Sequence, residues 1–207
     1  MKKYFSLIKY TQETLLVISI LTMMILPMFI VFRSDIITAD INQTLYFISH
    51  SFLFFVMMVR PLADIFTKVR WIRPLVILRK GTGVMSASII VSFILAKLII
   101  DPIGYFSSVA TLEYWSMVNF AVLAHIADIS AILLIITSNN LSKRLPYGWW
   151  KKIQKLSYVY FYGSALYVFL TYGNIDLLIE MILVTLVTTI AYFKNKKRVI
   201  LLKQQPI

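Results

Sequence analysis

The sequence predicts an all-α integral membrane protein, a six-transmembrane-helix bundle with both termini in the cytoplasm. Three observations support this prediction: an apolar composition, six long apolar stretches and a one-sided distribution of basic residues. Apolar residues make up 59% of the 207 residues and charged residues only 14%, with a mean hydropathy of +0.80. Because soluble domains carry about 25% charged residues, the composition excludes an ordinary soluble domain.

The six apolar stretches have roughly the 20 residues that are needed to cross a hydrocarbon core about 30 Å thick, although some are shorter. In chain order they are residues 15–32, 42–59, 82–100, 115–136, 156–172 and 175–193. Pro27 lies in the first stretch, where a membrane helix tolerates a kink. No internal repeat or flexible linker divides the chain, so we expect residues 1–207 to form a single domain.

Basic residues predict the orientation of the bundle, because the cytoplasmic segments of membrane proteins are rich in Lys and Arg. If the N-terminus is cytoplasmic, 19 of the 21 basic residues lie on the cytoplasmic side, and only Arg33 and Lys97 lie toward the other side. This asymmetry accounts for the net charge of +12 without nucleic acid as a partner. We expect a bacterial inner membrane, with an organellar inner membrane as the alternative.

The residue types exclude several kinds of chemistry. The chain has no cysteine, so it holds no disulfide, iron–sulfur cluster or thiolate-ligated haem. Two histidines leave little room for a zinc site, and the six glycines form no phosphate-binding loop. We therefore expect no catalytic constellation in this chain, which is at most the electron-transfer membrane subunit of an oxidoreductase.

Four ionisable residues near the outer ends of the predicted helices form two candidate pairs. Lys97 precedes Asp101 by four residues, and Asp176 precedes Glu180 by four residues. Residues at this spacing are neighbours on a helix surface, and carboxylates are favoured near a helix N-terminus. We expect both pairs to be structural.

The candidate cofactor-binding residues are His50, His125 and Asp128. His125 and Asp128 lie three residues apart in the fourth stretch, hence on one helix face. They form either a buried polar pair that holds helices together or a haem ligand, proton relay or quinone contact. His50 and His125 are predicted at depths that differ by only about 3 Å, which is compatible with one haem b bound by both.

From Arg60 to Tyr172 the order of features resembles the ferric-reductase-like transmembrane domain family. Within that family it is most similar to the haem-binding membrane subunit of the periplasmic methionine-sulfoxide reductase system. The matching residues are Arg60-Pro61-Leu62, Arg79-Lys80 with Gly83, Thr137-Ser138, Lys143-Arg144-Leu145, Trp150-Lys151 and Tyr158. The resemblance covers a little over half of the chain and implies the same six-helix scaffold.

The resemblance also implies where haem ligands would lie. The family's ligating histidines fall about ten residues after the glycine of the third span, at the start of the fifth span and 13 residues later. These positions hold Phe93, Gln154 and Tyr167 in this chain. Phenylalanine cannot ligate iron, glutamine is a poor ligand, and tyrosine must first lose its proton. The resemblance therefore implies the scaffold without the family's haem sites.

Two hypotheses about function follow. In the first, the chain has lost the family's haems and serves as an accessory subunit of a membrane complex, expected to be a redox complex, with no cofactor of its own. In the second, it carries electrons through a single haem b at His50 and His125, or through a quinone near His125 and Asp128. We favour the first hypothesis, since a single event, the loss of the haems, explains why all three ligand histidines are absent. A transporter is disfavoured, because the two halves lack matched helix breaks.

Overall fold

The computed structural model describes residues 2–33, 38–118, 120–138 and 147–203, and within these ranges it contains helices and no strands. The predicted all-α class is therefore confirmed. The elements are α1 (Lys2–Phe32), α2 (Ala39–Ile65), α3 (Ile72–Leu75), η1 (Val76–Leu78), α4 (Arg79–Ile100), α5 (Pro102–Val109), η2 (Glu113–Trp115), α6 (Ala121–Thr137), α7 (Tyr147–Gln154), α8 (Leu156–Tyr172) and α9 (Ile175–Lys203).

Four helical segments in the described part are long and apolar enough to cross a membrane. They are Lys3–Phe32, Asp40–Ile65, Ile72–Ile100 and Ile175–Arg198. The two other predicted spans correspond to α6 and α8, which have 17 residues each. At 1.5 Å per residue each of these helices is about 25 Å long, which is less than the thickness of an average hydrocarbon core.

The fourth predicted span begins later than expected. Residues 115–136 were expected to be helical throughout, but η2 ends at Trp115 and α6 starts only at Ala121. Phe120, directly before α6, has a left-handed backbone with φ of 55°, which a helix cannot continue through. The fifth predicted span agrees with α8, and Gly173, with φ of 66°, ends that helix.

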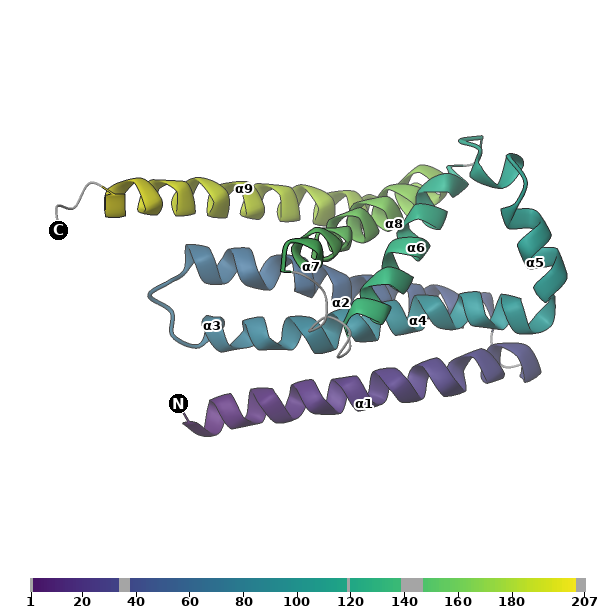
Figure 1. Cartoon of the computed structure of the whole chain (residues 1–207), viewed down its shortest axis with the longest axis horizontal. Helices are drawn as coiled ribbons and strands as arrows, with labels where there is room; N and C mark the ends of the chain where they lie inside the picture. Colours follow the sequence, from purple (N-terminus) through teal and green to yellow (C-terminus); the bar gives the residue numbers. More distant parts are fainter. Residues whose placement is uncertain (1, 34–37, 119, 139–146, 204–207) are drawn as a thin grey trace.

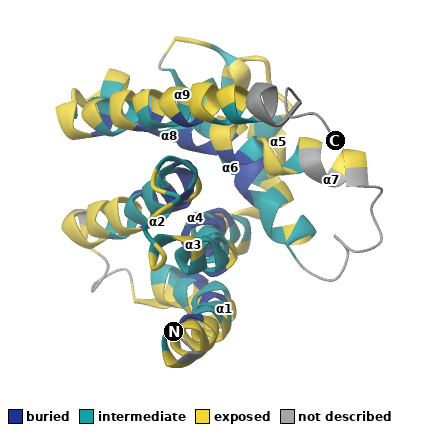
Figure 2. Ribbon diagram, turned by 90° about the vertical axis from the view of Figure 1, so that its left-hand side faces the viewer, coloured by how far each residue is buried: buried dark blue, intermediate teal, exposed yellow. Residues whose placement is uncertain are grey.

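The helices are arranged in three layers. In Figure 1, α1, α2, α4 and α9 run along the long axis of the molecule, and α6 crosses them obliquely. The end-on view in Figure 2 places α2 and α4 in the middle, α1 on one side, and α6, α8 and α9 on the other. The buried core is formed by Leu53, Met57, Ala87, Ala127, Ala131, Tyr160, Phe161 and Val184.

Small residues bring neighbouring helices close together. A Cβ added at Gly81 of α4 would lie 3.1 Å from Leu15 Cβ in α1, and one added at Gly163 of α8 would lie 3.2 Å from the Leu123 carbonyl oxygen in α6. Ala127 in α6 and Ala165 in α8 are fully or almost fully buried. Membrane helices use such small residues at their contacts, because van der Waals packing replaces the hydrophobic effect as the force between them.

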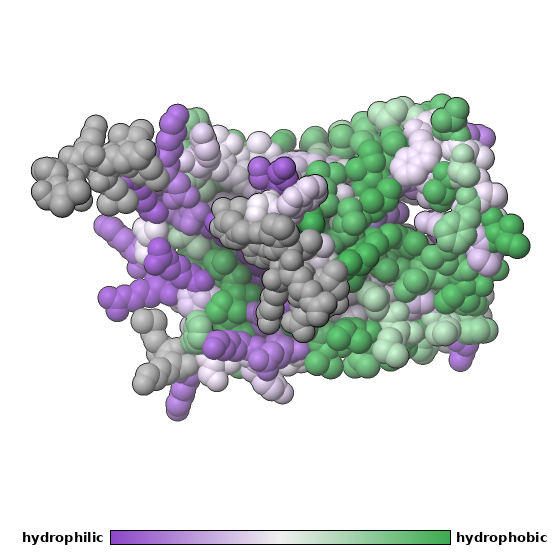
Figure 3. Space-filling view, in the orientation of Figure 1, coloured by the Kyte–Doolittle hydropathy of each residue, from purple (hydrophilic) through white to green (hydrophobic). Residues whose placement is uncertain are grey.

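Polar side chains gather at one end of the molecule. Figure 3 shows them at the end that carries the N-terminus, α3 and the last part of α9, whereas apolar side chains cover most of the remaining face. At the polar end, Asn195 Nδ2 donates to Asp64 Oδ2 at 3.0 Å, and Arg198 Nη2 donates to Thr67 Oγ1 at 3.1 Å. These bonds attach the last part of α9 to the end of α2 and to the connection between α2 and α3.

Candidate functional site

A buried hydroxyl cluster lies where α2, α4 and α8 meet. Ser49 Oγ donates to the Ser86 carbonyl oxygen at 3.0 Å. The Tyr160 hydroxyl lies 3.3 Å from Ser49 Oγ and 3.1 Å from Ser86 Oγ, and the two serine oxygens are 3.2 Å apart. All three residues are buried. Since a buried hydroxyl without a partner is costly, this network fixes the rotation of the three helices relative to one another.

His50, the residue after Ser49, contacts α9 and α8. Its Nε2 lies 3.2 Å from Glu180 Oε2, and its ring stacks on Phe161 with ring centroids 5.1 Å apart. The two atoms are at ion-pair distance but not aligned for a hydrogen bond, and no water-accessible surface remains on either. Asp176 and Glu180, one turn apart and expected to be structural, differ in their surroundings: Asp176 is exposed, while Glu180 faces His50.

His125 lies against aromatic rings from the segment that precedes α6. Its ring stacks on Tyr114, with centroids 3.6 Å apart and planes 10° from parallel, and Trp115 approaches its edge at 6.0 Å. Burial, reinforced by the neighbouring Tyr105, raises the pKa of Tyr114 to about 12, so its phenol stays neutral. His125 Nδ1 is buried and has no hydrogen-bond partner in the described part of the chain.

Asp128 has no hydrogen bond or ion pair among the described residues, so the expected His125–Asp128 pair is not a direct contact. Its carboxyl group interacts electrostatically with Lys97 of α4 and with the hydroxyl groups of surrounding tyrosines. Those tyrosines are Tyr46, Tyr114, Tyr160 and Tyr167. The negative charge of Asp128 therefore acts on tyrosines of α2, η2 and α8 without a direct contact to them among the described residues.

The expected Lys97–Asp101 pair is also absent from the described structure. Asp101 instead ends α4 and caps α5, where its Oδ1 accepts a hydrogen bond from the Gly104 amide at 2.8 Å. Pro102 follows at the first position of α5, where its missing N–H costs nothing. The side chain of Lys97 is exposed and acts on His125 and Asp128 only through its charge.

Phe93, Gln154 and Tyr167 occupy the positions that the resemblance to the ferric-reductase-like domain assigns to haem ligands. The Phe93 ring stacks on Tyr46 with centroids 4.6 Å apart. Tyr167 meets Tyr172 edge to face at 6.5 Å. Gln154 ends α7 and lines a cavity. The two aromatic side chains are thus packed against other rings of the bundle.

The histidines do not share a contact in the structure. His50 contacts Glu180 and Phe161, whereas His125 contacts Tyr114 and Trp115. Within the described ranges no group of three His, Asp or Glu side chains could hold a metal ion. The geometry therefore offers a largely buried histidine–carboxylate contact, with His50 directly after Ser49 of the hydroxyl cluster.

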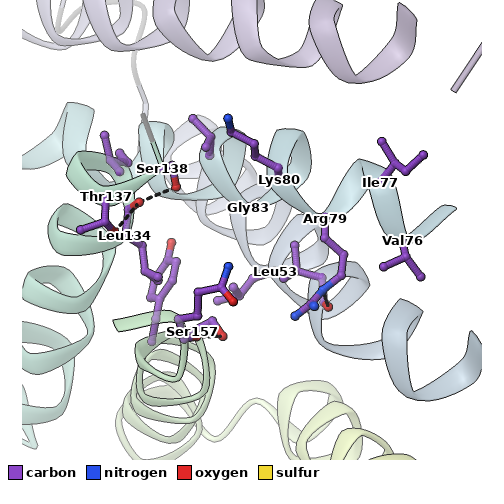
Figure 4. Close-up of a pocket in the computed structure, with 15 residues that line it drawn as sticks. Leu53, Val76, Ile77, Arg79, Lys80, Gly83, Leu134, Thr137, Ser138 and Ser157 are labelled. Atoms are coloured by element: carbon purple, nitrogen blue, oxygen red, sulfur yellow. Dashed lines mark hydrogen bonds between the residues drawn. The ribbon is translucent and has the colours of Figure 1, made fainter. Parts of the chain in front are cut away.

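A cavity of about 370 Å³ lies between α2, α4, α6 and α8 (Figure 4). Its apolar wall includes Leu53, Val56, Leu134 and Ile135, and its polar wall includes Arg79, Lys80, Thr137, Ser138, Gln154, Ser157 and Tyr160. Because Tyr160 lines the cavity and also belongs to the hydroxyl cluster, the cavity and the cluster are directly connected.

Sequence reasoning identified His50, His125 and Asp128 but missed the residues around them. Ser49, Ser86 and Tyr160 are ordinary residues of membrane helices, and no spacing along the chain relates them. Glu180 was recognisable as an ionisable residue one turn into a predicted span. Its partner, however, depends on which face of α9 is turned inward. The basic pair Arg79-Lys80 was noted only for the family resemblance and the orientation.

Comparison of the chain with protein-family models, curated proteins and solved structures finds no match.

Proposed function

We propose that the chain is a polytopic accessory subunit of a membrane complex, expected to be a redox complex, and that it holds no haem of its own. In this proposal six helices cross the membrane, with both termini in the cytoplasm, and the bundle is a ferric-reductase-like scaffold. The membrane is a bacterial inner membrane, or an organellar inner membrane as the alternative. The partners are lipids and other subunits of the complex.

One observation supports the proposed absence of haem: other side chains are packed at the positions where the haem ligands would lie. Phe93 stacks on Tyr46 and Tyr167 meets Tyr172, so aromatic rings occupy these two positions. The two histidines of the chain are engaged with different partners. Ligation by His50 would cost its interaction with Glu180, and ligation by His125 would cost its stacking on Tyr114.

The alternative is a b-type haem electron carrier, or a quinone-interacting subunit, that uses His50 and His125 with Asp128. Its support is that His125 Nδ1 is buried without a hydrogen-bond partner among the described residues. An orphaned imidazole nitrogen in a protein interior is a position where a ligand is expected. The two proposals differ in one observable, the presence of a chromophore.

The test is a reduced-minus-oxidised absorption spectrum of the detergent-purified chain, with haem quantified per chain. We expect a flat spectrum from monodisperse, helical protein. A b-type signal near one haem per chain that disappears in the double variant His50→Ala, His125→Ala would overturn the proposal. The matched variant is Phe93→His, which places a histidine at one of the three positions that the resemblance assigns to haem ligands. On its own it should not restore haem binding, because the other two positions still hold Gln154 and Tyr167.

The accessory role is tested separately by purifying the chain from its native membrane. We expect a stoichiometric complex in which another subunit carries a redox cofactor. A chain that purifies alone, or only with subunits that carry no redox cofactor, would contradict this part of the proposal.

A further inference from the structure

The cavity between α2, α4, α6 and α8 combines an apolar wall with a guanidinium group. Arg79, at the start of α4, reaches toward the cavity, and Leu134 and Ser157 line it from α6 and α8 (Figure 4). Arg79 Nε donates to the Val56 carbonyl oxygen of α2 at 3.0 Å. This bond fixes the guanidinium group, and its two terminal amino groups have no hydrogen-bond partner among the described residues.

The positive charge at the cavity is not neutralised by the described part of the chain. Arg60 lies outside the lining of the cavity, but its positive charge also acts on Arg79. Lys80 also lines the cavity. No carboxylate of the described residues forms an ion pair with any of these three cations. Because like charges close together are unfavourable, an anion bound in the cavity beside Arg79 and Lys80 would be stabilised.

Neutral donors and acceptors complete the polar wall. Thr137, Ser138, Gln154 and Ser157 line the cavity together with Arg79. The hydroxyl groups already donate to backbone carbonyl oxygens: those of Thr137 and Ser138 to carbonyl oxygens of α6, and that of Ser157 to the Gln154 carbonyl oxygen at the end of α7. Gln154 is exposed and its side-chain amide has no hydrogen-bond partner among the described residues, so it can donate to a ligand. An anion with several acceptor oxygens could therefore accept hydrogen bonds from the guanidinium group of Arg79 and from the side-chain amide of Gln154.

We propose that this cavity binds the phosphate group of an anionic phospholipid. A guanidinium fork matches the oxygens of a phosphate diester. The apolar residues Leu53, Val56, Leu134 and Ile135 suit the glycerol backbone and the start of the acyl chains, which a free phosphate ion lacks. Two basic residues, Arg79 and Lys80, line the cavity, and anionic lipid headgroups attract basic residues at the membrane surface. The proposal rests on the insertion of the chain in a membrane, as proposed above.

The experiment uses the full chain, purified in a mild detergent and stripped of lipid. Thermal unfolding is followed during titration with mixed micelles that contain phosphatidylglycerol, with micelles that contain phosphatidylcholine, and with inorganic phosphate. We expect saturable stabilisation by phosphatidylglycerol, weaker stabilisation by phosphatidylcholine, and none by phosphate at the same concentration. Equal effects of the two lipids would overturn the proposal, as would a phosphate effect as large as that of phosphatidylglycerol.

Two variants locate the binding site. Arg79→Gln should weaken phosphatidylglycerol binding by roughly 10- to 100-fold, the range expected for the loss of a charged hydrogen bond. Arg73→Gln is the matched control, because it removes one exposed positive charge from α3 without touching the cavity. Equal weakening by the two variants would overturn the site, since it would mean that only the net charge matters.

A third variant covers the case in which Arg79→Gln fails to fold. Leu134→Trp fills the cavity while keeping every charge and the bond from Arg79 to Val56. It should abolish saturable binding of phosphatidylglycerol, and unchanged binding would overturn the proposal. Lipid titration and the haem spectrum are independent readouts, so this inference and the proposed absence of haem can fail separately.

Discussion

At the scale of single residues, the His50–Glu180 pair is the most consequential feature. It joins α2 to α9 across the interior, and the side chains are only 10% and 21% exposed. A buried ion pair contributes little net stability compared with an apolar pair of the same size, but removing one partner leaves the other without solvent or counter-charge. The cost of a substitution therefore depends on whether both partners are changed.

A double-mutant cycle on this pair gives the first prediction. Glu180→Leu and His50→Leu should each lower the free energy of unfolding by about 1–3 kcal/mol, because each leaves a buried polar group unsatisfied. The double variant should lose clearly less than the sum of the two. Denaturant unfolding in detergent micelles measures all four proteins.

The matched control for that cycle is Asp176→Leu, one turn before Glu180 on the same helix. Asp176 is exposed, so its substitution should change the free energy of unfolding by less than about 0.5 kcal/mol. Strict additivity of the His50 and Glu180 substitutions would mean that the 3.2 Å contact contributes no coupling.

The second prediction concerns two tyrosines that are neighbours on α8. Tyr160→Phe removes the hydroxyl group that approaches Ser49 and Ser86, and should lower the free energy of unfolding by about 1 kcal/mol. Tyr162→Phe removes a hydroxyl group that pairs with Thr185 at an exposed position, and should change it by much less. Thermal unfolding of both variants makes the comparison, and a larger loss from Tyr162→Phe would show that the hydroxyl cluster is not a stabilising centre.

At the scale of helices, the contact between α6 and α8 depends on residues without large side chains. Gly163 faces the Leu123 carbonyl oxygen, and the Ala127 Cβ atom is the next nearest group. By contrast, a Cβ atom at Gly83 of α4 would make ordinary contact with Val56 at 3.6 Å. Gly83 and Gly163 therefore serve different purposes in α4 and α8.

The third prediction compares the same substitution at the two glycines. Gly83→Ala should raise the free energy of unfolding by about 0.5–1 kcal/mol, because alanine loses less backbone entropy in a helix. Gly163→Ala should instead lower it by about 1 kcal/mol, since the new methyl group pushes against a backbone carbonyl oxygen that cannot rotate away. The measurement is the unfolding midpoint of each variant. If both midpoints shift in the same direction by the same amount, the close approach of α6 and α8 does not explain why residue 163 is a glycine.

The helices were more predictable than the site, for a physical reason. Apolar length marks the hydrocarbon region, so it located α8 but not the start of α1 at Lys2, where the helix continues past the apolar stretch through polar residues. A side chain's partner depends on the rotation of each helix about its axis. The sequence therefore identified His50 as a candidate ligand and Glu180 as an ionisable residue of a predicted span, but it could not pair them.

At the scale of the whole molecule, the question is how many helices cross the membrane. Four segments are long enough on their own, and α6 and α8 are about 25 Å long. In Figure 1, α7, which precedes α8, lies short of the end reached by α3 and α9. If α6 and α8 only dipped into the bilayer, the lysines around α7 would be buried in hydrocarbon, at about 2.5–3.5 kcal/mol for each charge at the centre. Thinning the bilayer around two short helices costs only fractions of a kcal/mol per Å.

The fourth prediction separates six spans from four by the position of Lys152. The chain has no cysteine, so a single introduced cysteine is the only thiol that a membrane-impermeant maleimide can label. Thr111→Cys and Asn174→Cys should react in intact cells, and Lys196→Cys only after lysis; these three outcomes are the same for six spans and for four. Lys152→Cys distinguishes them. If α6 and α8 cross the membrane, this cysteine should react only after lysis. If it reacts in intact cells, only four helices cross, and the segment between α6 and α8 lies on the outer side.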